Sequence, residues 1–277
     1  QSKLGNLLGK RTYQYFLVAN GIIGPVLLGA AVATFFNGSN FVVSKGNITQ
    51  EAMPVISQWA NGWHGLDALL DLWNVVLGLA VLLLSRCLGI LYFINNVSAV
   101  ELLPRFRRRL MIESVCFVVF FVPFVIYLLF KAGFAVDAAS GSIVMESYKY
   151  LHNLMAMPWV LGLLLLGVVA VLFGLGRSIL CSTYNKGIWF AGVGTVLAVL
   201  ALLLTVGYNN TAYYPSAADL QSSLTLSNSC SSLFTLKTMA YVSVFIPFVL
   251  AYIIYAWRAI DRKPITADEM KESDHAY

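Results

Sequence analysis

Charged residues are scarce in this chain of 277 residues, and this scarcity decides its class. Asp, Glu, Lys and Arg make up 11% of the sequence, whereas a typical soluble domain has about a quarter. The mean hydropathy is +0.76, and 59% of the residues are hydrophobic. The composition therefore excludes an ordinary soluble fold and indicates an integral membrane protein.

Cysteine and histidine are also rare. The four cysteines form no CxxC pair, and only Cys230 falls in an outer loop, where it has no partner for a disulfide. The three histidines, His64, His152 and His275, lie at or beyond the predicted membrane edges. A haem inside the bilayer needs an axial His or Met from a helix interior. We therefore expect no haem ligand, metal site or covalently bound cofactor in this chain, and nucleophile, phosphate-loop and zinc motifs are absent from it.

Long apolar runs are what the chain has in abundance. A helix needs roughly 20 apolar residues to cross a bilayer. The sequence predicts an all-α, polytopic membrane bundle with about six transmembrane helices in one membrane domain, residues 1–277. The helices are expected near 13–36, 69–93, 110–130, 157–175, 187–208 and 234–257. Pro25, Pro123 and Pro247 fall inside these windows, where membrane helices tolerate a kink.

Basic residues alternate between successive connections. The N-terminal segment has three, the segment ELLPRFRRRL (101–110) has four arginines, and the tail 258–277 has four. In contrast, the connection 37–68 has only Lys45, and the serine-rich loop 209–233 has none. Because cytoplasmic loops collect Lys and Arg, we expect both ends of the chain in the cytoplasm and loop 209–233 outside. The net charge of +5 then reflects topology, and no nucleic-acid partner is expected.

Ionisable residues near membrane depth are few. Arg86 lies close enough to the inner end of its span for its side chain to reach cytoplasmic headgroups. Glu113 follows Arg109 by four residues, which predicts an i, i+4 ion pair. Lys131 and Lys237 fall at helix ends. No charge without a route to water is therefore expected.

A second polar group, the outer polar cluster, consists of His64, Asp67 and Asp71. A helix beginning near Gly65 would place all three side chains on nearly the same face. Two interpretations stay open. The cluster either admits protons or a cation, or its acids complement the dipole of a helix start while water wets them, and the second is favoured.

Small residues recur at intervals of four in the fifth predicted span, at Gly187, Ala191 and Thr195. Small side chains let two helix backbones approach closely in a membrane. We therefore expect this stripe to form a close helix contact, and it carries no information about activity.

The last third of the chain contains an ordered set of motifs. Residues 213–258 read YYPSAADLQSSLTLSNSCSSLFTLKTMAYVSVFIPFVLAYIIYAWR. This order of Pro-Ser, Ser-Leu-Thr, Ser-Ser, Thr-Leu-x-x-Met and a helix with a mid-span proline and Leu-x-Tyr resembles the last loop and helix of subunit II of cytochrome bd quinol oxidases. The matching positions are Pro215, Ser216, Ser223, Leu224, Thr225, Ser231, Ser232, Thr235, Leu236, Met239, Pro247, Leu250 and Tyr252.

Two shorter segments resemble the same family. The family's Glu-Leu-x-x-Arg-x-Arg loop is matched at Glu101, Leu102, Arg105 and Arg107. The opening SKLGN, with Ser2 and Lys3, resembles the segment before the family's fourth helix, which implies that the family's first three helices, with most of its proposed proton-uptake acids, lie upstream of this sequence. Residues 59–77 depart from the pattern, because the outer polar cluster stands where members are mostly apolar.

The resemblance implies the function. The chain is expected to be a haem-free subunit of a two-subunit terminal oxidase, a heterodimer in the bacterial cytoplasmic membrane that oxidises quinol and reduces dioxygen to water. The b- and d-type haems are expected in the partner, subunit I. Membrane lipid is a further expected contact, and a structural quinone and a small accessory subunit are left open. Lys3 is the candidate for a proton path, and Glu101 with Arg105 for a cytoplasmic brace.

The serine-rich loop has a physical interpretation of its own. A loop that packs on a membrane domain must satisfy its backbone groups, and Ser and Thr side chains do so through turns and helix caps. We therefore expect loop 209–233 to fold as a lid over the outer surface, with Ser231 or Ser232 capping the last helix. The candidate structural residues are Ser223, Thr225, Ser231, Ser232 and Thr235.

Two other classes of protein compete with this interpretation. A secondary transporter or channel acting without a redox partner would suit six spans and the outer polar cluster. Such proteins, however, usually carry charges or broken helices near the membrane midplane, and the sequence shows little of either. A purely structural membrane scaffold is the third alternative.

Overall fold

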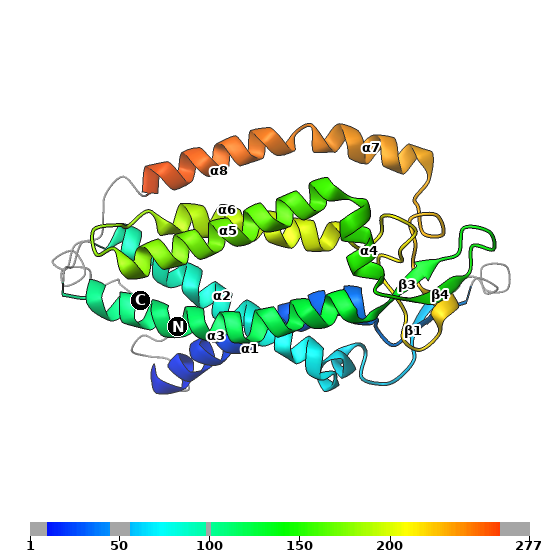
Figure 1. Cartoon of the computed structure of the whole chain (residues 1–277), viewed down its shortest axis with the longest axis horizontal. Coiled ribbons are helices and arrows are strands. Elements are labelled where there is room, and N and C mark those ends of the chain that lie inside the picture. The colour runs from blue at the N-terminus through cyan, green and yellow to red at the C-terminus, as the bar shows by residue number, and fades with distance from the viewer. Residues whose placement is uncertain (1–9, 45–55, 98–100, 261–277) are drawn as a thin grey trace.

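The computed structural model describes residues 10–44, 56–97 and 101–260. Within them, six segments are long and apolar enough to cross a membrane, which confirms the polytopic all-α bundle. The segments are α1 (Lys10–Asn37), α2 (Leu72–Asn96), α3 (Leu103–Phe130), α5 (Pro158–Leu180), α6 (Gly187–Leu204) and the consecutive pair α7 (Leu233–Ser243) and α8 (Ile246–Ile260). Successive spans run in opposite directions, so the start of α1 and the end of α8 lie at the same end of the bundle (Figure 1).

The helix boundaries follow local signals. Helix α2 begins at Leu72 because the side chain of Asp71 accepts hydrogen bonds from backbone N–H groups of its first turn. Helix α3 begins at Leu103, seven residues before the apolar window at 110, and Pro104 fits its first turn. The tail 261–277 lies outside the described residues.

One apolar core joins α1, α2, α3, α4 (Lys149–Ala156), α5 and α6. Its side chains come from the inward faces of these helices, and Leu91, Ile94, Leu110 and Val160 are fully buried. The closest helix neighbours are α5 with α6, α1 with α2, and α2 with α3. The bundle is thus made of two tight pairs, α1–α2 and α5–α6, held together through α3 and the core.

Glycines allow the close approach within both pairs. A Cβ added to Gly194 of α6 would lie 2.6 Å from the carbonyl oxygen of Gly167 in α5, and one added to Gly78 of α2 would lie 2.6 Å from the carbonyl oxygen of Val26 in α1. Gly187 and Ala191 both face Gly174 of α5. The prediction that the small-residue stripe forms a close helix contact is therefore confirmed for these two residues, while the Thr195 hydroxyl donates to the Ala191 carbonyl at 2.7 Å.

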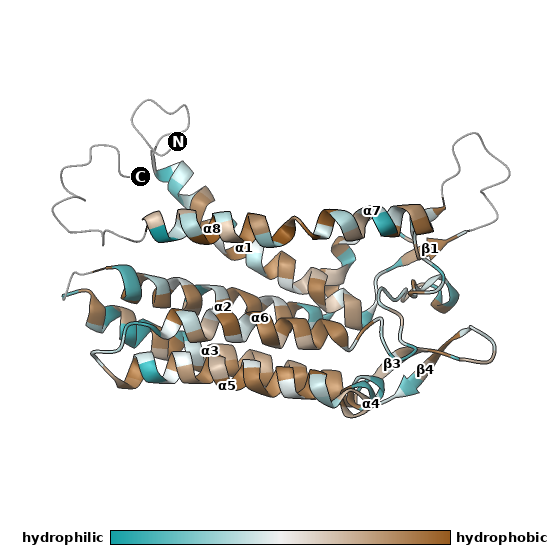
Figure 2. Ribbon diagram, turned by 90° about the horizontal axis from the view of Figure 1, so that it is seen from above, coloured by the Kyte–Doolittle hydropathy of each residue, from teal (hydrophilic) through white to brown (hydrophobic). Residues whose placement is uncertain are grey.

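The end of the bundle that carries loop 209–233 has structure that the apolar pattern does not predict. Strands β1 (Phe41–Val43) and β2 (Ser57–Trp59) pair antiparallel, as do β3 (Ala132–Val136) and β4 (Ile143–Ser147). The 3-10 turns η2 (Leu66–Leu70) and η3 (Leu220–Ser222) lie in the same connections. Figure 2 shows the hairpins and α4 gathered at one end of the apolar spans.

The last span differs from the other five. It is interrupted at Val244 and Phe245, just before Pro247, whereas Pro25 and Pro123 lie inside continuous helices. Its most apolar window is 0% buried within the chain, against 17–33% for the other spans. In Figure 2, α7 and α8 run beside the bundle and apart from α5 and α6.

The Gly167–Gly194 crossing gives a direct test of this architecture. We expect Gly194→Val to destabilise the protein by about 1–3 kcal/mol, because the added side chain must push two helix backbones apart. Gly192→Val on the same helix is the matched control, since a Cβ there meets no atom within 4 Å. Melting temperatures of the two purified variants measure the difference, and equal melting temperatures would contradict the close crossing.

Candidate functional site

The serine-rich loop is folded, and its part around Ser216, Ser222 and Ser223 is buried against β1. The amide of Ser216 donates to the Ser223 hydroxyl at 3.0 Å, and the Ser216 hydroxyl donates to the Phe41 carbonyl at 2.5 Å. The amide of Val43 donates to the Ser222 hydroxyl at 2.9 Å. Ser216 and Ser223 are both 0% exposed. Hydroxyl groups of the loop thus satisfy backbone groups of a neighbouring segment, as a folded lid requires.

The other hydroxyl residues of the loop have separate roles. The Thr225 hydroxyl accepts from the Asn228 amide at 3.1 Å and closes a turn. The Ser232 hydroxyl accepts from the Thr235 amide and begins α7, so the N-cap prediction is confirmed for Ser232. Ser231 is exposed and makes no hydrogen bond to any described residue.

The outer polar cluster does not share one helix face. The expected helix from Gly65 is wrong, because η2 covers Leu66–Leu70 and the backbone is extended at Asp71 before α2 begins. Asp71 accepts from the amides of Trp73 and Asn74 at 2.7 and 3.2 Å. This carboxylate therefore complements the start of α2, as expected if the acids of the cluster stabilise a helix start.

The other two members of the cluster point to different surroundings. The Asp67 carboxylate accepts from the side-chain amides of Asn40 at 2.5 Å and Asn61 at 2.7 Å. These hydrogen bonds, with Asn40 contributing most, lower the pKa of Asp67. His64 is exposed and has a left-handed backbone with φ of 49°. The three side chains thus do not converge on one ion.

A buried polar network closes the outer end of α1. The ammonium group of Lys131 donates to the Phe36 carbonyl at 2.9 Å and to the Asn37 side-chain oxygen at 2.6 Å. The Asn37 amide donates to Asn74 at 2.6 Å, and the Tyr150 hydroxyl donates to the Phe36 carbonyl at 3.0 Å. Lys131, just after α3, and Tyr150 of α4 thus satisfy a carbonyl in the last turn of α1, where a cation also complements the helix dipole, and Asn74 of α2 holds the Asn37 side chain.

Burial affects the charge of Lys131. Its ammonium group lies 5.3 Å from the centre of the Tyr127 ring. Desolvation lowers the pKa of Lys131 to about 8, and the Asp71 carboxylate opposes this shift. Lys131 is therefore at a helix end, as predicted, but it turns inward instead of toward water.

A charged pair joins α2 and α3 at membrane depth. The Arg86 guanidinium donates to both carboxylate oxygens of Glu113, at 2.8 and 2.5 Å. The Arg86 side chain is 48% exposed, but that of Glu113 is only 6% exposed. Each residue lies ten positions from the inner end of its helix, or roughly 15 Å at 1.5 Å per residue. Beside the pair, the Cys87 sulfur and the Ser114 hydroxyl are 3.7 Å apart.

This pair corrects three predictions. Glu113 does not pair with Arg109, because the helix crossing brings Arg86 onto both of its oxygens. Arg86 does not extend freely to headgroups, since its guanidinium is held by Glu113. The expectation that every charge has a route to water is wrong for Glu113, whose side chain is 6% exposed and is compensated by Arg86.

Sequence reasoning also missed the role of Arg107. Its guanidinium donates to the carbonyl groups of Ser178, Cys181, Ser182 and Tyr184 and to the Asn185 side chain, all in or before the hinge between α5 and α6. These groups include carbonyls at the end of α5 that lack helix partners. The arginine-rich motif was visible in the sequence, but which arginine turns toward the hinge depends on the tertiary fold.

The remaining candidates are placed as follows. Lys3 lies outside the described residues, as does Lys45. Glu101 and Arg105 are both exposed, and no ion pair joins them among the described side chains. The proposed brace between them therefore has no direct contact in this structure.

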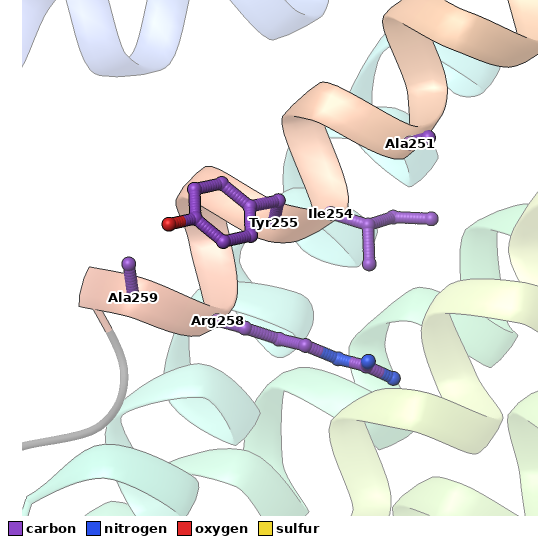
Figure 3. A pocket seen from close by; sticks show the side chains of 5 residues that line it. All are labelled: Ala251, Ile254, Tyr255, Arg258 and Ala259. Atoms are coloured by element: carbon purple, nitrogen blue, oxygen red, sulfur yellow. The ribbon is translucent and has the colours of Figure 1, made fainter.

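Two hollows open on the surface of the described chain. One, of about 380 Å³, is lined by α8 alone, through Ala251, Ile254, Tyr255, Arg258 and Ala259, and Figure 3 shows the Arg258 side chain extending away from its helix. The other, of about 310 Å³, is lined by Arg105, Arg108, Arg109 and Ile112 of α3. Neither contains a histidine or a carboxylate.

Comparison with known families identifies the family of the chain. The model of a family described as cytochrome bd terminal oxidase subunit II matches residues 1–260. The chain belongs to this family. The resemblance read from the last loop and helix is therefore confirmed. A comparison with curated proteins found no match.

Membership gives this subunit its general role. It is a multi-pass membrane component of a terminal oxidase complex, an oxidoreductase that contains haem and includes a partner subunit. This assignment favours the oxidase interpretation over a transporter or channel acting alone.

The described histidines, and two of the methionines that the sequence offers as ligands, lie on exposed surfaces. His152 lies at the outer end, where its side chain is 54% exposed and contacts the Glu146 carboxylate at 3.1 Å. His64 is exposed in the outer connection. Met111 and Met239 are 47% and 64% exposed on the outward faces of α3 and α7. Both described histidines and these two methionines are thus exposed, whereas Met157 is partly buried against the apolar core.

The ion pair between α2 and α3 can be tested by a double-mutant cycle. We expect Arg86→Leu to destabilise the complex by about 1–3 kcal/mol, below the usual range for a fully buried pair because Arg86 is half exposed. The double variant Arg86→Leu with Glu113→Leu should recover stability, since no unpaired carboxylate remains. Arg109→Leu removes the partner expected from i, i+4 spacing and should cost less stability than Arg86→Leu. Thermal unfolding of the assembled complex measures all three, and a larger loss for Arg109→Leu would contradict the assignment.

The Lys131 network predicts a pH dependence. The folded-state pKa of about 8 lies below the ordinary value of 10.5, so the unfolded state binds more protons between these values. Stability relative to Lys131→Met should therefore rise from pH 8 to 10.5, by at most about 3 kcal/mol. Melting curves at several pH values measure the change. Lys186→Met, which alters an exposed lysine, should keep the wild-type pH profile, and a Lys131→Met profile parallel to the wild type would contradict the burial.

Proposed function

We propose that this chain is the haem-free subunit of a quinol-oxidising, dioxygen-reducing terminal oxidase of the bacterial cytoplasmic membrane. The observation that carries the proposal is the family match over residues 1–260. In this assignment, subunit I of the heterodimer binds the b- and d-type haems and the quinol. The outer position of His64 and His152 supports it, because neither histidine can supply an axial ligand from inside the bundle.

The last span is our proposed contact with subunit I. Helices α7 and α8 have no buried residues within the chain, although their outward side chains include large apolar residues such as Phe245, Phe248 and Tyr255. The other spans bury part of their windows against each other. Since an oxidase of this family includes a partner subunit, an uncovered span connected to a folded lid is the surface we assign to that partner.

The distribution of basic residues supports the orientation. Several basic residues lie toward the end of the bundle where α1 starts and α8 ends, namely Arg107, Arg177, Lys186 and Arg258. Because basic residues favour the cytoplasmic side, we place this end in the cytoplasm and the lid outside. Lys3, outside the described residues, remains our candidate for a proton path, and Glu101 and Arg105 are exposed near the start of α3.

Within the complex, the subunit would act through its structure. The buried Glu113–Arg86 pair and the Lys131 network hold the helices in a fixed arrangement next to the partner. A fixed apolar wall limits the access of water and sets the local dielectric around any haem that it faces. A structural quinone and a small accessory subunit remain compatible with this role.

The haem assignment is tested by removing the described histidines. We expect His64→Ala and His152→Ala to leave the b- and d-type bands in the reduced-minus-oxidised spectrum unchanged per assembled complex. Quinol-dependent oxygen consumption per haem should also be unchanged. Glu146→Ala is the matched control for His152→Ala, because it breaks the same outer contact while the imidazole stays. A haem band lost from an otherwise intact complex would refute the proposal.

A further inference from the structure

Three arginines at the start of α3 line one surface hollow. Arg105, Arg108 and Arg109 share it with Ile112, and their spacing of i, i+3, i+4 and i+7 places all four on one helix face. The three arginines are exposed, and none makes an ion pair or hydrogen bond with another described residue. The hollow has a volume of about 310 Å³. It therefore concentrates three guanidinium groups that have no counter-charge in the described part of the chain.

The neighbouring residues explain why these charges remain unpaired. Glu113, four residues after Arg109, is occupied on both oxygens by Arg86. Arg107, in the middle of the same motif, turns to the hinge between α5 and α6. Glu101 is exposed and pairs with no described basic group. Arg107 and Glu113 thus have partners of their own in the described chain. Arg105, Arg108 and Arg109 have none there, and they can bind an external anion.

The helix start adds to the positive potential. The N-cap position of α3, Leu102, provides no side-chain hydrogen bond to the first turn. The first N–H groups of a helix carry a partial positive charge and attract anions. Guanidinium groups match phosphate oxygens in geometry and charge. The chemistry of the hollow therefore fits a phosphate.

The surface next to the hollow favours a phosphate attached to an apolar chain. Ile112 begins a row of exposed apolar side chains that continues along α3 with Val115, Val119, Val122 and Ile126. Their spacing follows the helix period, so they lie on the face that begins at the arginines. A charged group at the end of the span, joined to an apolar track along it, has the layout of a lipid headgroup and its acyl chain.

We propose that this hollow binds the phosphate of an anionic phospholipid, whose acyl chain lies along the exposed face of α3. The arginines hold the phosphate at the headgroup level, and the apolar row contacts the hydrocarbon. This binding does not depend on where the haems or the quinol are bound, so it stands apart from the proposed function.

The test measures lipid retention by the whole oxidase complex. The complex is purified in a neutral detergent, and phosphatidylglycerol binding is followed by native mass spectrometry and by the melting temperature. We expect Arg108→Gln with Arg109→Gln to weaken phosphatidylglycerol binding by roughly tenfold or more. The control is Arg11→Gln with Lys186→Gln, which removes the same charge from residues that do not line the hollow, and it should retain the lipid.

Other outcomes would overturn the proposal. An equal loss in the control variant would mean that general surface charge binds the lipid. Equal stabilisation of the wild-type complex by phosphatidylcholine would remove the role of the anionic headgroup. Equal stabilisation by millimolar inorganic phosphate would show a site for a free anion. If the double variant does not assemble, the test uses Arg108→Lys with Arg109→Lys. The wild-type complex is then also compared in phosphatidylglycerol and in phosphatidylcholine.

Discussion

The two glycine crossings are the constraint on which the rest of the bundle depends. At Gly167–Gly194 and at Gly78–Val26, helix backbones approach more closely than any larger side chain would allow. Without a hydrophobic driving force between helices in lipid, such close contact supplies much of the attraction. The α1–α2 crossing brings the end of α1 beside Asn74, and the α5–α6 crossing brings the hinge within reach of Arg107. The polar contacts at both ends of the bundle thus follow from the approach of the backbones.

A further helix contact, between α2 and α3, determines how charge is distributed. Helices α2 and α3 meet so that Arg86 covers both oxygens of Glu113, which keeps a buried carboxylate compensated. Arg109 consequently loses its nearest acid along the helix. One ion pair therefore stabilises the interior and also leaves a positive surface at the start of α3, where we propose that a lipid phosphate binds.

The spans and much of the lid could be predicted from the sequence because their signals are local. Long apolar runs, the small-residue stripe at Gly187 and Ala191, and the cap at Ser232 each depend on residues close together in the chain. The partner of Glu113 could not be predicted, because spacing along one helix says nothing of a residue on the next. The short strands β1 to β4 also give little signal, since three to five residues are too few for a clear alternation.

The outer polar cluster shows the same limit. The spacing of His64, Asp67 and Asp71 suits one helix face, but Asp71 caps α2 and so ends the preceding turn. A residue that favours a helix cap competes with the continuation of the helix through it. The apolar pattern could not show this, because both arrangements keep the same residues at the membrane edge.

The central claim is that the last span, which the other described spans leave uncovered, contacts the partner subunit that we propose to bear the haems. Site-specific photocrosslinking tests it most directly, with a benzophenone side chain placed at Tyr255 of α8 and, as a control, at Val169 of α5, both exposed in this chain. The account predicts a covalent adduct between position 255 and the haem-bearing subunit, and none from position 169. Adducts of position 255 with lipid alone, or with another copy of this chain, would contradict it.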